Sequence, residues 1–200
     1  MKRVPAIATL AALLLSGCAH TFDYGWTVLM ENGKGFYSFN RIGDANWRSE
    51  NDAIVADKGK GGFLVTRQSF GNFELRAEFW ADHTTNSGIF FRAQNPQQIG
   101  ADNAYEANIF DQRPGQEYST GAIVNVAQVR APLPKAGGQW NTYEIYANGP
   151  ELVIKLNGVV TAAMNDNQFK KGPIGLQFGN GADGKPGGAI KWRKVMIKPI

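Results

Sequence analysis

Short runs of alternating apolar and polar residues recur along most of the chain. The clearest run, Phe73 to Trp80, places Phe, Leu, Ala and Phe on one side and Glu, Arg, Glu and Trp on the other. This is the pattern of a strand with one buried face. Similar runs predict strands at 53–56, 62–66, 73–80, 88–93, 105–111, 122–126, 140–147, 152–156, 174–178 and 190–198. Because no run has a convincing helical period, the sequence predicts an all-β domain of two packed sheets.

Turn residues divide these strands. Asn157-Gly158 predicts a hairpin between 152–156 and the residues that follow, and Asn148-Gly149-Pro150 predicts another turn. In the last strand Ile190 and Trp192 share one parity whereas Val195 and Ile197 share the other, which predicts a bulge or bend. Loops rich in Gly, Asn, Asp and Pro lie at 94–104, 112–121, 131–139 and 179–188. Loops of this size on a sandwich commonly carry functional sites.

The N-terminus has the order of a secretory signal: Lys2 and Arg3, an apolar stretch from Ala6 to Leu15, then small residues. The stretch is too short to span a membrane, which needs about 20 apolar residues. Leu15-Ser16-Gly17-Cys18 resembles a lipobox, so we expect a signal peptide at 1–17 and an acylated Cys18 that ties the protein to a membrane. The alternative is an ordinary signal peptide with an unmodified cysteine.

Residues 19 to about 30 lack clear periodicity, so we expect a tether at 18–25 and one domain at 26–200. Removal of 1–17 leaves 19 basic against 17 acidic residues, a net charge of +2. The basic residues are scattered and form no patch of the kind that binds nucleic acid. Since Cys18 is the only cysteine, no disulfide supports the fold, and the 24 glycines favour short strands joined by tight turns.

No catalytic motif settles the chemistry by spacing alone, and His83 is the one histidine outside the tether. The informative strands are 86–92 and 105–111, which carry polar residues among apolar ones. In the second, Glu106 and Asn108 project to one face, where Glu106 could bond sugar hydroxyls or remove a proton if burial raises its pKa. The equally weighted alternative is a solvent-exposed face in which Glu106 pairs with Arg92 or Arg76.

Aromatic side chains near these strands could stack on sugar rings, although most aromatics of a sandwich belong to its core. We assign Trp140 and Trp192 to packing and keep Trp80 and Tyr118 as possible ligand contacts. Asp102, Asp111 and Glu106 with loop carbonyls could hold a divalent cation such as calcium, although no fixed spacing supports such a site.

Several ordered motifs together resemble the 3-keto-disaccharide hydrolase family from about Trp26 to Ile200. They are the stretch from Phe70 to Leu75, NSGIFFR at 86–92, YEANIFD at 105–111, Thr120-Gly121-Ala122, GQWNTYEI at 138–145, Leu156-Asn157-Gly158, GPIGLQ at 172–177 and the strand around Trp192-Arg193. The resemblance implies a concanavalin- or laminin-G-like jelly roll of two curved antiparallel sheets, with a site on the concave face. It also implies a secreted or lipid-anchored protein, here at the periplasmic face of the outer membrane.

The resemblance further implies cleavage of glycosides whose sugar carries a ketone at carbon 3. The ketone acidifies the hydrogen at carbon 2, so a base can remove it, and the enolate then expels the group at carbon 1 before water adds. Glu106 would be the base or a ligand of metal or substrate, and Arg92 would bind substrate oxygens or stabilise the enolate. His83 is the candidate for a further titratable group ahead of the NSG motif.

The remaining family positions suggest substrate contacts. Asn86, Asp111 and Arg193 match the family pattern, although the first two could be turn residues and Arg193 an ion-pair partner. Asn108 stands where the family usually has glutamine, and its shorter side chain reaches less far.

Two functions therefore compete: an enzyme acting on 3-keto-glycosides, which we favour, and a non-catalytic carbohydrate-binding lipoprotein. An enzyme requires Glu106, Arg92 and another titratable group such as His83 or Asp111 close together. A binding module requires only one edge of hydroxyl-bonding groups beside an exposed aromatic such as Trp80.

Overall fold

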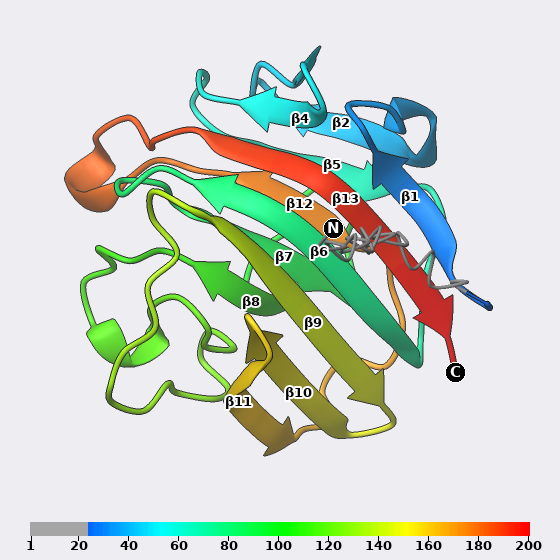
Figure 1. Ribbon diagram of the computed structural model, residues 1–200. Coiled ribbons are helices and arrows are strands. Elements are labelled where there is room, and N and C mark those ends of the chain that lie inside the picture. Colours follow the sequence, from blue (N-terminus) through cyan, green and yellow to red (C-terminus); the bar gives the residue numbers. More distant parts are fainter. Residues whose placement is uncertain (1–23) are drawn as a thin grey trace, which may run out of the picture.

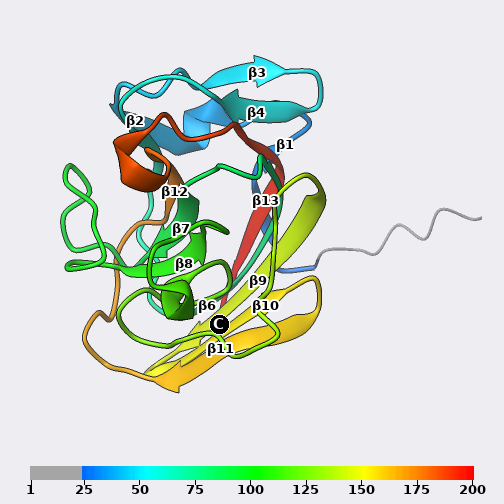
Figure 2. The same ribbon diagram turned by 90° about the vertical axis from the view of Figure 1, so that its left-hand side faces the viewer.

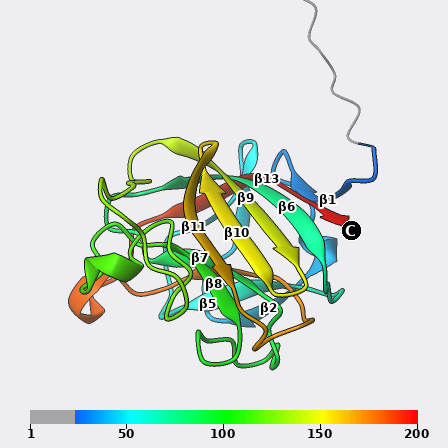
Figure 3. The same ribbon diagram turned by 90° about the horizontal axis from the view of Figure 1, so that it is seen from below.

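Two antiparallel sheets lie face to face in the computed structural model, which describes residues 24–200 (Figure 1). The larger sheet has the order β11-β10-β9-β6-β13-β4-β3, with β1 also paired to β13. Its strands are β1 (Thr27–Glu31), β3 (Arg48–Glu50), β4 (Ala53–Ala56), β6 (Phe73–Ala81), β9 (Trp140–Asn148), β10 (Glu151–Leu156), β11 (Val159–Asn165) and β13 (Ile190–Pro199). Figure 3 shows the strands of this sheet above those of the smaller one.

The smaller sheet has the order β2-β5-β12-β7-β8. Its strands are β2 (Phe39–Gly43), β5 (Gly62–Thr66), β12 (Gly175–Phe178), β7 (Ser87–Phe91) and β8 (Tyr105–Ile109). The helical elements are single 3₁₀ turns: η1 (Phe36–Ser38), η2 (Gln116–Tyr118) and η3 (Ala182–Gly184). Among residues 24–200 no helix is long and apolar enough to cross a membrane. The predicted signal peptide and Cys18 lie outside the described residues.

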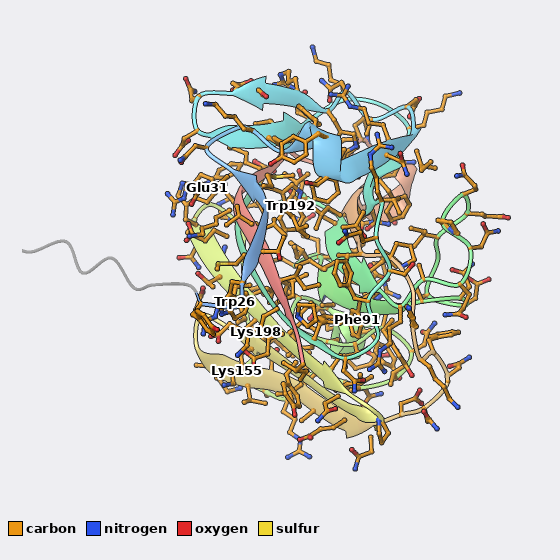
Figure 4. All side chains as sticks on the ribbon, turned by 90° about the vertical axis from the view of Figure 1, so that its right-hand side faces the viewer. Trp26, Glu31, Phe91, Lys155, Trp192 and Lys198 are labelled. Carbon is orange, nitrogen blue, oxygen red and sulfur yellow. The ribbon has the colours of Figure 1, made fainter. Side chains whose placement is uncertain are left out.

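The core lies between the sheets and follows the alternation of each strand. On β6 the predicted apolar face is buried, with Phe73 and Phe79 fully inaccessible, whereas Arg76 on the other face is exposed. Trp192 from the larger sheet and Phe91 from the smaller one both lie in this interior, and both are fully buried (Figure 4). The prediction that Trp192 packs in the core is confirmed, but Trp140 is 38% exposed on the outer face.

Most predicted strands are present within a residue or two. The 157–158 hairpin joins β10 to β11, and β13 shifts register between Trp192 and Lys194, which confirms the predicted bulge. The predicted strand at 122–126 is instead a tight turn that touches β8 through one bridge, Ala107 to Ile123. Strands β1, β2 and β3 escaped prediction because they are short and largely polar or exposed.

Arg92, directly after β7, ties three distant loops together from inside the molecule. It is 1% exposed and has a left-handed backbone, with φ of 54°. Its guanidinium donates to the carbonyls of Gly71 (2.9 Å), Gly149 (2.8 Å) and Phe169 (3.1 Å), and to Oδ1 of Asn72 (3.3 Å). Burial lowers the pKa of this guanidinium. Because its donors are used by main-chain carbonyls, Arg92 is an anchor of the fold, and the expectations that it contacts substrate or pairs with Glu106 are wrong.

We therefore predict that Arg92→Met lowers the free energy of unfolding by about 3–5 kcal/mol, since it leaves buried carbonyls without donors. Urea denaturation of the wild type and the variant measures this change. Arg130→Met serves as the control, because Arg130 is exposed. A loss of less than about 1 kcal/mol for Arg92→Met would contradict the anchoring role.

Candidate functional site

The candidate site lies on the outer face of the smaller sheet, where polar residues of β8 and β12 lie on either side of a glycine of β7. Gly88 on β7 pairs with Asn108 on β8. On the other side of β7, Leu176 pairs with Ile89, so the antiparallel register places Gln177 of β12 beside Gly88. Gln177, Gly88 and Asn108 therefore form a row across the sheet. The missing side chain at Gly88 leaves an open space in the middle of this row.

The side chain of Glu106 fills this space. Glu106 pairs with Phe90 and leans along β8 toward Gly88, so that a Cβ at position 88 would lie 2.9 Å from its Oε1 and 3.1 Å from its Cγ. Alternation on β8 points Glu106 and Asn108 away from the core, while Tyr105 and Ala107 point into it, as predicted. Only glycine permits the carboxyl group to lie so close to the neighbouring strand.

Glu106 is a buried carboxyl group without a partner. It is 7% exposed, and no hydrogen bond or ion pair to its carboxyl occurs within residues 24–200. Burial raises the pKa of Glu106 to about 8, against the opposing effect of the positive charge of Arg113. The alternative of an exposed Glu106 paired to Arg92 or Arg76 is therefore wrong, and Arg76 faces Glu144 on the other sheet.

Three further polar atoms in this part of the molecule have no protein partner. They are Oδ1 of Asn108, Oε1 of Gln177 and Oγ of Ser119. Asn108 is fully buried, and its amide nitrogen donates to the carbonyl of Tyr118 (2.6 Å), so the side chain supports the strand and the expectation that it contacts substrate is wrong. Each such buried atom costs about 1–3 kcal/mol unless something bonds it. All three atoms are closed off from solvent, so they are not themselves surface contacts for a ligand.

A hollow of about 420 Å³ adjoins this row at Gln177. Five side-chain amides line it, together with apolar groups that include Phe63 and Ile99. The amides belong to Asn86, Gln97, Gln98, Gln177 and Asn180. Its volume is within the range of small-molecule sites, and amides beside an aromatic ring suit a sugar.

Besides Asn108, two of the predicted contact residues lie at this site. Asn86 lines the hollow, and its amide also donates to the carbonyl of Asn180 (2.6 Å), so it fixes the adjoining loop. Tyr118 contributes its carbonyl to the placement of Asn108, and its side chain is half-buried. Both therefore support the position of other site residues.

Asp111 and His83 are not brought to Glu106. The carboxylate of Asp111 accepts hydrogen bonds from Thr120 Oγ1 (2.6 Å) and from the backbone nitrogens of Ala136 and Gly137, which makes it a loop-fixing residue. His83 is exposed, and its imidazole packs against the backbone at Gly137. The expectation that His83 or Asp111 lies close to Glu106 as a second titratable group is wrong.

Trp80 and Arg193 lie on the outer face of the other sheet. The Lys191 ammonium is 4.8 Å from the Trp80 ring centroid, and Arg193 pairs with Glu78 at 2.7 Å. Figure 2 shows β7 and β8 on the opposite side of the molecule from β13, which carries Arg193. The core separates the two faces, so one small substrate cannot contact Glu106 and these two residues together.

The three carboxylates proposed to bind a cation do not form a cluster. Within the described residues no group of three or more His, Cys, Asp or Glu side chains is placed to hold a metal ion. Asp111 is used by its loop, and Asp102 lies exposed in another one. The structure thus gives no support to a calcium site built from Asp102, Asp111 and Glu106.

Sequence reasoning missed Gly88, Gln177 and Arg113. Gln177 carried a usable signal, because it is the one polar residue between the apolar Leu176 and Phe178 of a strand. Such a position must face away from the core. The role of Arg113 had no signal, because it depends on how a loop folds back over the sheet.

Comparison with known proteins places this site within a recognised domain. The model of the 3-keto-alpha-glucoside-1,2-lyase-like domain matches residues 25–198. No curated protein matches the chain.

Solved structures share the fold at low identity. A candidate glycosyl hydrolase from Parabacteroides distasonis has a TM-score of 0.73 at 18% identity, covering 88% of this chain and 94% of that one. The carbohydrate binding module CBM66 of Bacillus subtilis has a TM-score of 0.59 at 15% identity, covering 87% and 95%. A Bacillus subtilis protein with a galectin-like fold has a TM-score of 0.64 at 12% identity, covering 86% and 95%. The predicted jelly roll is confirmed.

The raised pKa of Glu106 predicts how stability depends on pH. Below about pH 4.5 the group is protonated in both the folded and unfolded states, so its contribution is fully present. As pH rises toward 8 only the unfolded state ionises, and the wild type loses about 1.4 kcal/mol per pH unit from this group. Glu106→Gln removes this loss, so its stability relative to wild type should increase by a few kcal/mol between pH 4.5 and pH 8.5.

Urea denaturation at both pH values measures the change. Glu117→Gln is the matched control, since Glu117 is an exposed glutamate on η2. A pH-independent difference between Glu106→Gln and wild type would show that Glu106 titrates alike in both states.

Proposed function

We propose that this chain, which belongs to the 3-keto-alpha-glucoside-1,2-lyase-like family, cleaves the glycosidic bond of sugars oxidised to a ketone at carbon 3. The observation that carries the proposal is Glu106, an unpaired carboxyl group that is 7% exposed and has a pKa of about 8. A general base works best when its pKa lies near the working pH. Glu106 meets this requirement within the matched domain.

In the proposed reaction the ionised carboxylate of Glu106 removes the proton from carbon 2. The C–H electrons form the enolate with the carbon-3 ketone, and the enolate then expels the carbon-1 oxygen, which takes a proton from a water molecule and leaves as the alcohol. The hydroxide formed from that water adds to carbon 1 of the resulting enone, and protonated Glu106 returns a proton to carbon 2. The sum is hydrolysis, with Glu106 unchanged.

The neighbouring groups suit this chemistry. The half-buried Gln177 lines the first hollow, where its amide nitrogen can donate to the hydroxyl groups of the sugar and hold carbon 2 near the carboxylate. Arg113, whose charge already acts on Glu106, is the cation available to stabilise the developing enolate. Arg113 takes the role that the sequence suggested for Arg92.

A non-catalytic carbohydrate-binding module is the second candidate function. The amide-lined hollow would serve such a module equally well, and His83 and Asp111 do not join Glu106 as a further acid or base. What favours the enzyme is the unpaired Glu106, because a buried carboxyl group without a partner costs stability and a lectin does not need one.

The place of the protein in the cell remains a prediction from its N-terminus. We propose that Cys18 carries lipid and holds the domain at the periplasmic face of the outer membrane. Because the described domain begins after the predicted tether, the protein can be studied without its lipid as residues 19–200.

We predict that residues 19–200 release the alcohol from a 3-keto-glucoside and leave the unoxidised glucoside intact, since only the ketone acidifies carbon 2. Glu106→Gln should lower kcat by about 10²–10⁴-fold, the usual contribution of a general base. Glu117→Gln should keep wild-type activity. Chromatographic assay of the released alcohol provides the measurement.

Equal cleavage of both glucosides would overturn the ketone-dependent mechanism. No release from either, with binding of oligosaccharide retained, would favour the non-catalytic module.

A further inference from the structure

A second hollow continues the site across the outer face of the smaller sheet. It measures about 530 Å³ and shares Ile42 and Gln97 with the first hollow. Between the two, Ile99 from loop 94–104 packs against Phe63 and Phe90. The two hollows are thus neighbouring parts of one surface, which adjoins the row beside Glu106 at Gln177.

All the charged residues that line these hollows are basic. Lys60 lines the first, Arg67 and Lys171 line the second, and neither lining contains Asp or Glu. The rest of the second lining is mostly small, amide or hydroxyl-bearing, including Asn40, Ser69 and Gln94. Asp44 accepts from the backbone nitrogens of Lys60 and Gly61 beside the first hollow, so the excess of positive charge lies at the second hollow, which favours anions.

The cations of the second hollow are available to a ligand. Lys171 is exposed, and its ammonium has no hydrogen-bond or salt-bridge partner in the part of the chain that the structure describes. Arg67 uses only Nε, which donates to the carbonyl of Tyr37 (2.9 Å), so its two terminal nitrogens can still bind an anion. A guanidinium with free terminal nitrogens suits a carboxylate or sulfate.

Both cations lie beyond strand ends: Arg67 directly follows β5, and the carbonyl of Lys171 accepts from Nε2 of Gln94, three residues after β7 ends. The Glu106 carboxyl lies over β7, and β12, β5 and β2 follow in sequence across the sheet. Strands are about 4.8 Å apart, so β5 and β2 lie about 10 Å and 14 Å from β7. Asn40 on β2 and Val65 on β5 line the second hollow. A ligand that reaches it from Glu106 must be longer than one sugar.

We infer that the substrate is an oligosaccharide or glycoside whose leaving portion carries an anionic group, a carboxylate or a sulfate ester, held by Arg67 and Lys171. This inference rests on the proposed function and names its substrate class. The oxidised sugar occupies the first hollow beside Gln177, and the bond to be cleaved lies near Glu106. The leaving portion extends into the second hollow, where Arg67 and Lys171 lie.

The experiment uses three 3-keto-glucosides that share one extended aglycone and differ only at its far end: a carboxylate, a sulfate ester or a neutral carboxamide. We expect kcat/KM for at least one anionic substrate to exceed that for the carboxamide by about fivefold, mainly through KM, as for one exposed ion pair. The anionic substrate with the higher kcat/KM shows whether the site prefers a carboxylate or a sulfate ester. In 0.5 M salt the preference should fall toward unity, because exposed charges are screened.

Variants identify the residues responsible. Lys171→Gln should reduce the preference and the Arg67→Gln, Lys171→Gln double variant should abolish it. Lys170→Gln should retain it, since Lys170 is an exposed neighbour that lines neither hollow. Equal kcat/KM for all three substrates, or an undiminished preference in the double variant, would overturn the inference.

Turnover of the carboxamide substrate tests the proposed function separately. If none of the substrates is cleaved, that function fails, and calorimetric binding of the same three compounds decides the inference. Tighter binding of an anionic compound that is lost in the double variant supports the anion site, whereas equal binding rejects it.

Discussion

The close approach of Glu106 to Gly88 is the constraint on which the site depends. Alternation along β8 sends Glu106 away from the core, and the missing Cβ at Gly88 lets its carboxyl lie against the neighbouring strand. A Cβ there would meet Oε1 of Glu106 at 2.9 Å and the carbonyl of Ala107 at 3.2 Å. The same contact buries the carboxyl group, and burial raises its pKa. Position and reactivity thus have one physical origin.

The two outer faces of the sandwich differ in how their charged side chains are paired. On the larger sheet several charges are paired, as in Arg193 with Glu78 and Arg76 with Glu144. On the smaller sheet Glu106 is left unpaired, although Arg92 follows β7 directly. Arg92 turns into the interior and bonds loop carbonyls, so it stabilises the fold without neutralising Glu106. This separation of roles keeps a carboxyl group available for chemistry.

The sequence predicted those features that depend on local alternation. It gave the strand that carries Glu106 and Asn108, their shared face, the 157–158 hairpin and the bulge in β13. It failed where the outcome depends on long-range packing. Arg92 belongs to the NSGIFFR motif, yet its partners Gly149 and Phe169 are far away in the chain, and nothing near Arg92 indicates them. Trp80 lies on a strand of the other sheet, which alternation alone cannot reveal.

The pH dependence of kcat/KM on a 3-keto-glucoside tests the central claim most directly, since it reports the pKa of the base in the free enzyme. The account requires the ionised form of Glu106, which is present above its pKa. It therefore predicts a rate that rises about tenfold per pH unit through the neutral range and levels off near pH 8. A rate that is already constant from pH 6 upward would contradict it, because the base would then be a carboxylate with an ordinary pKa.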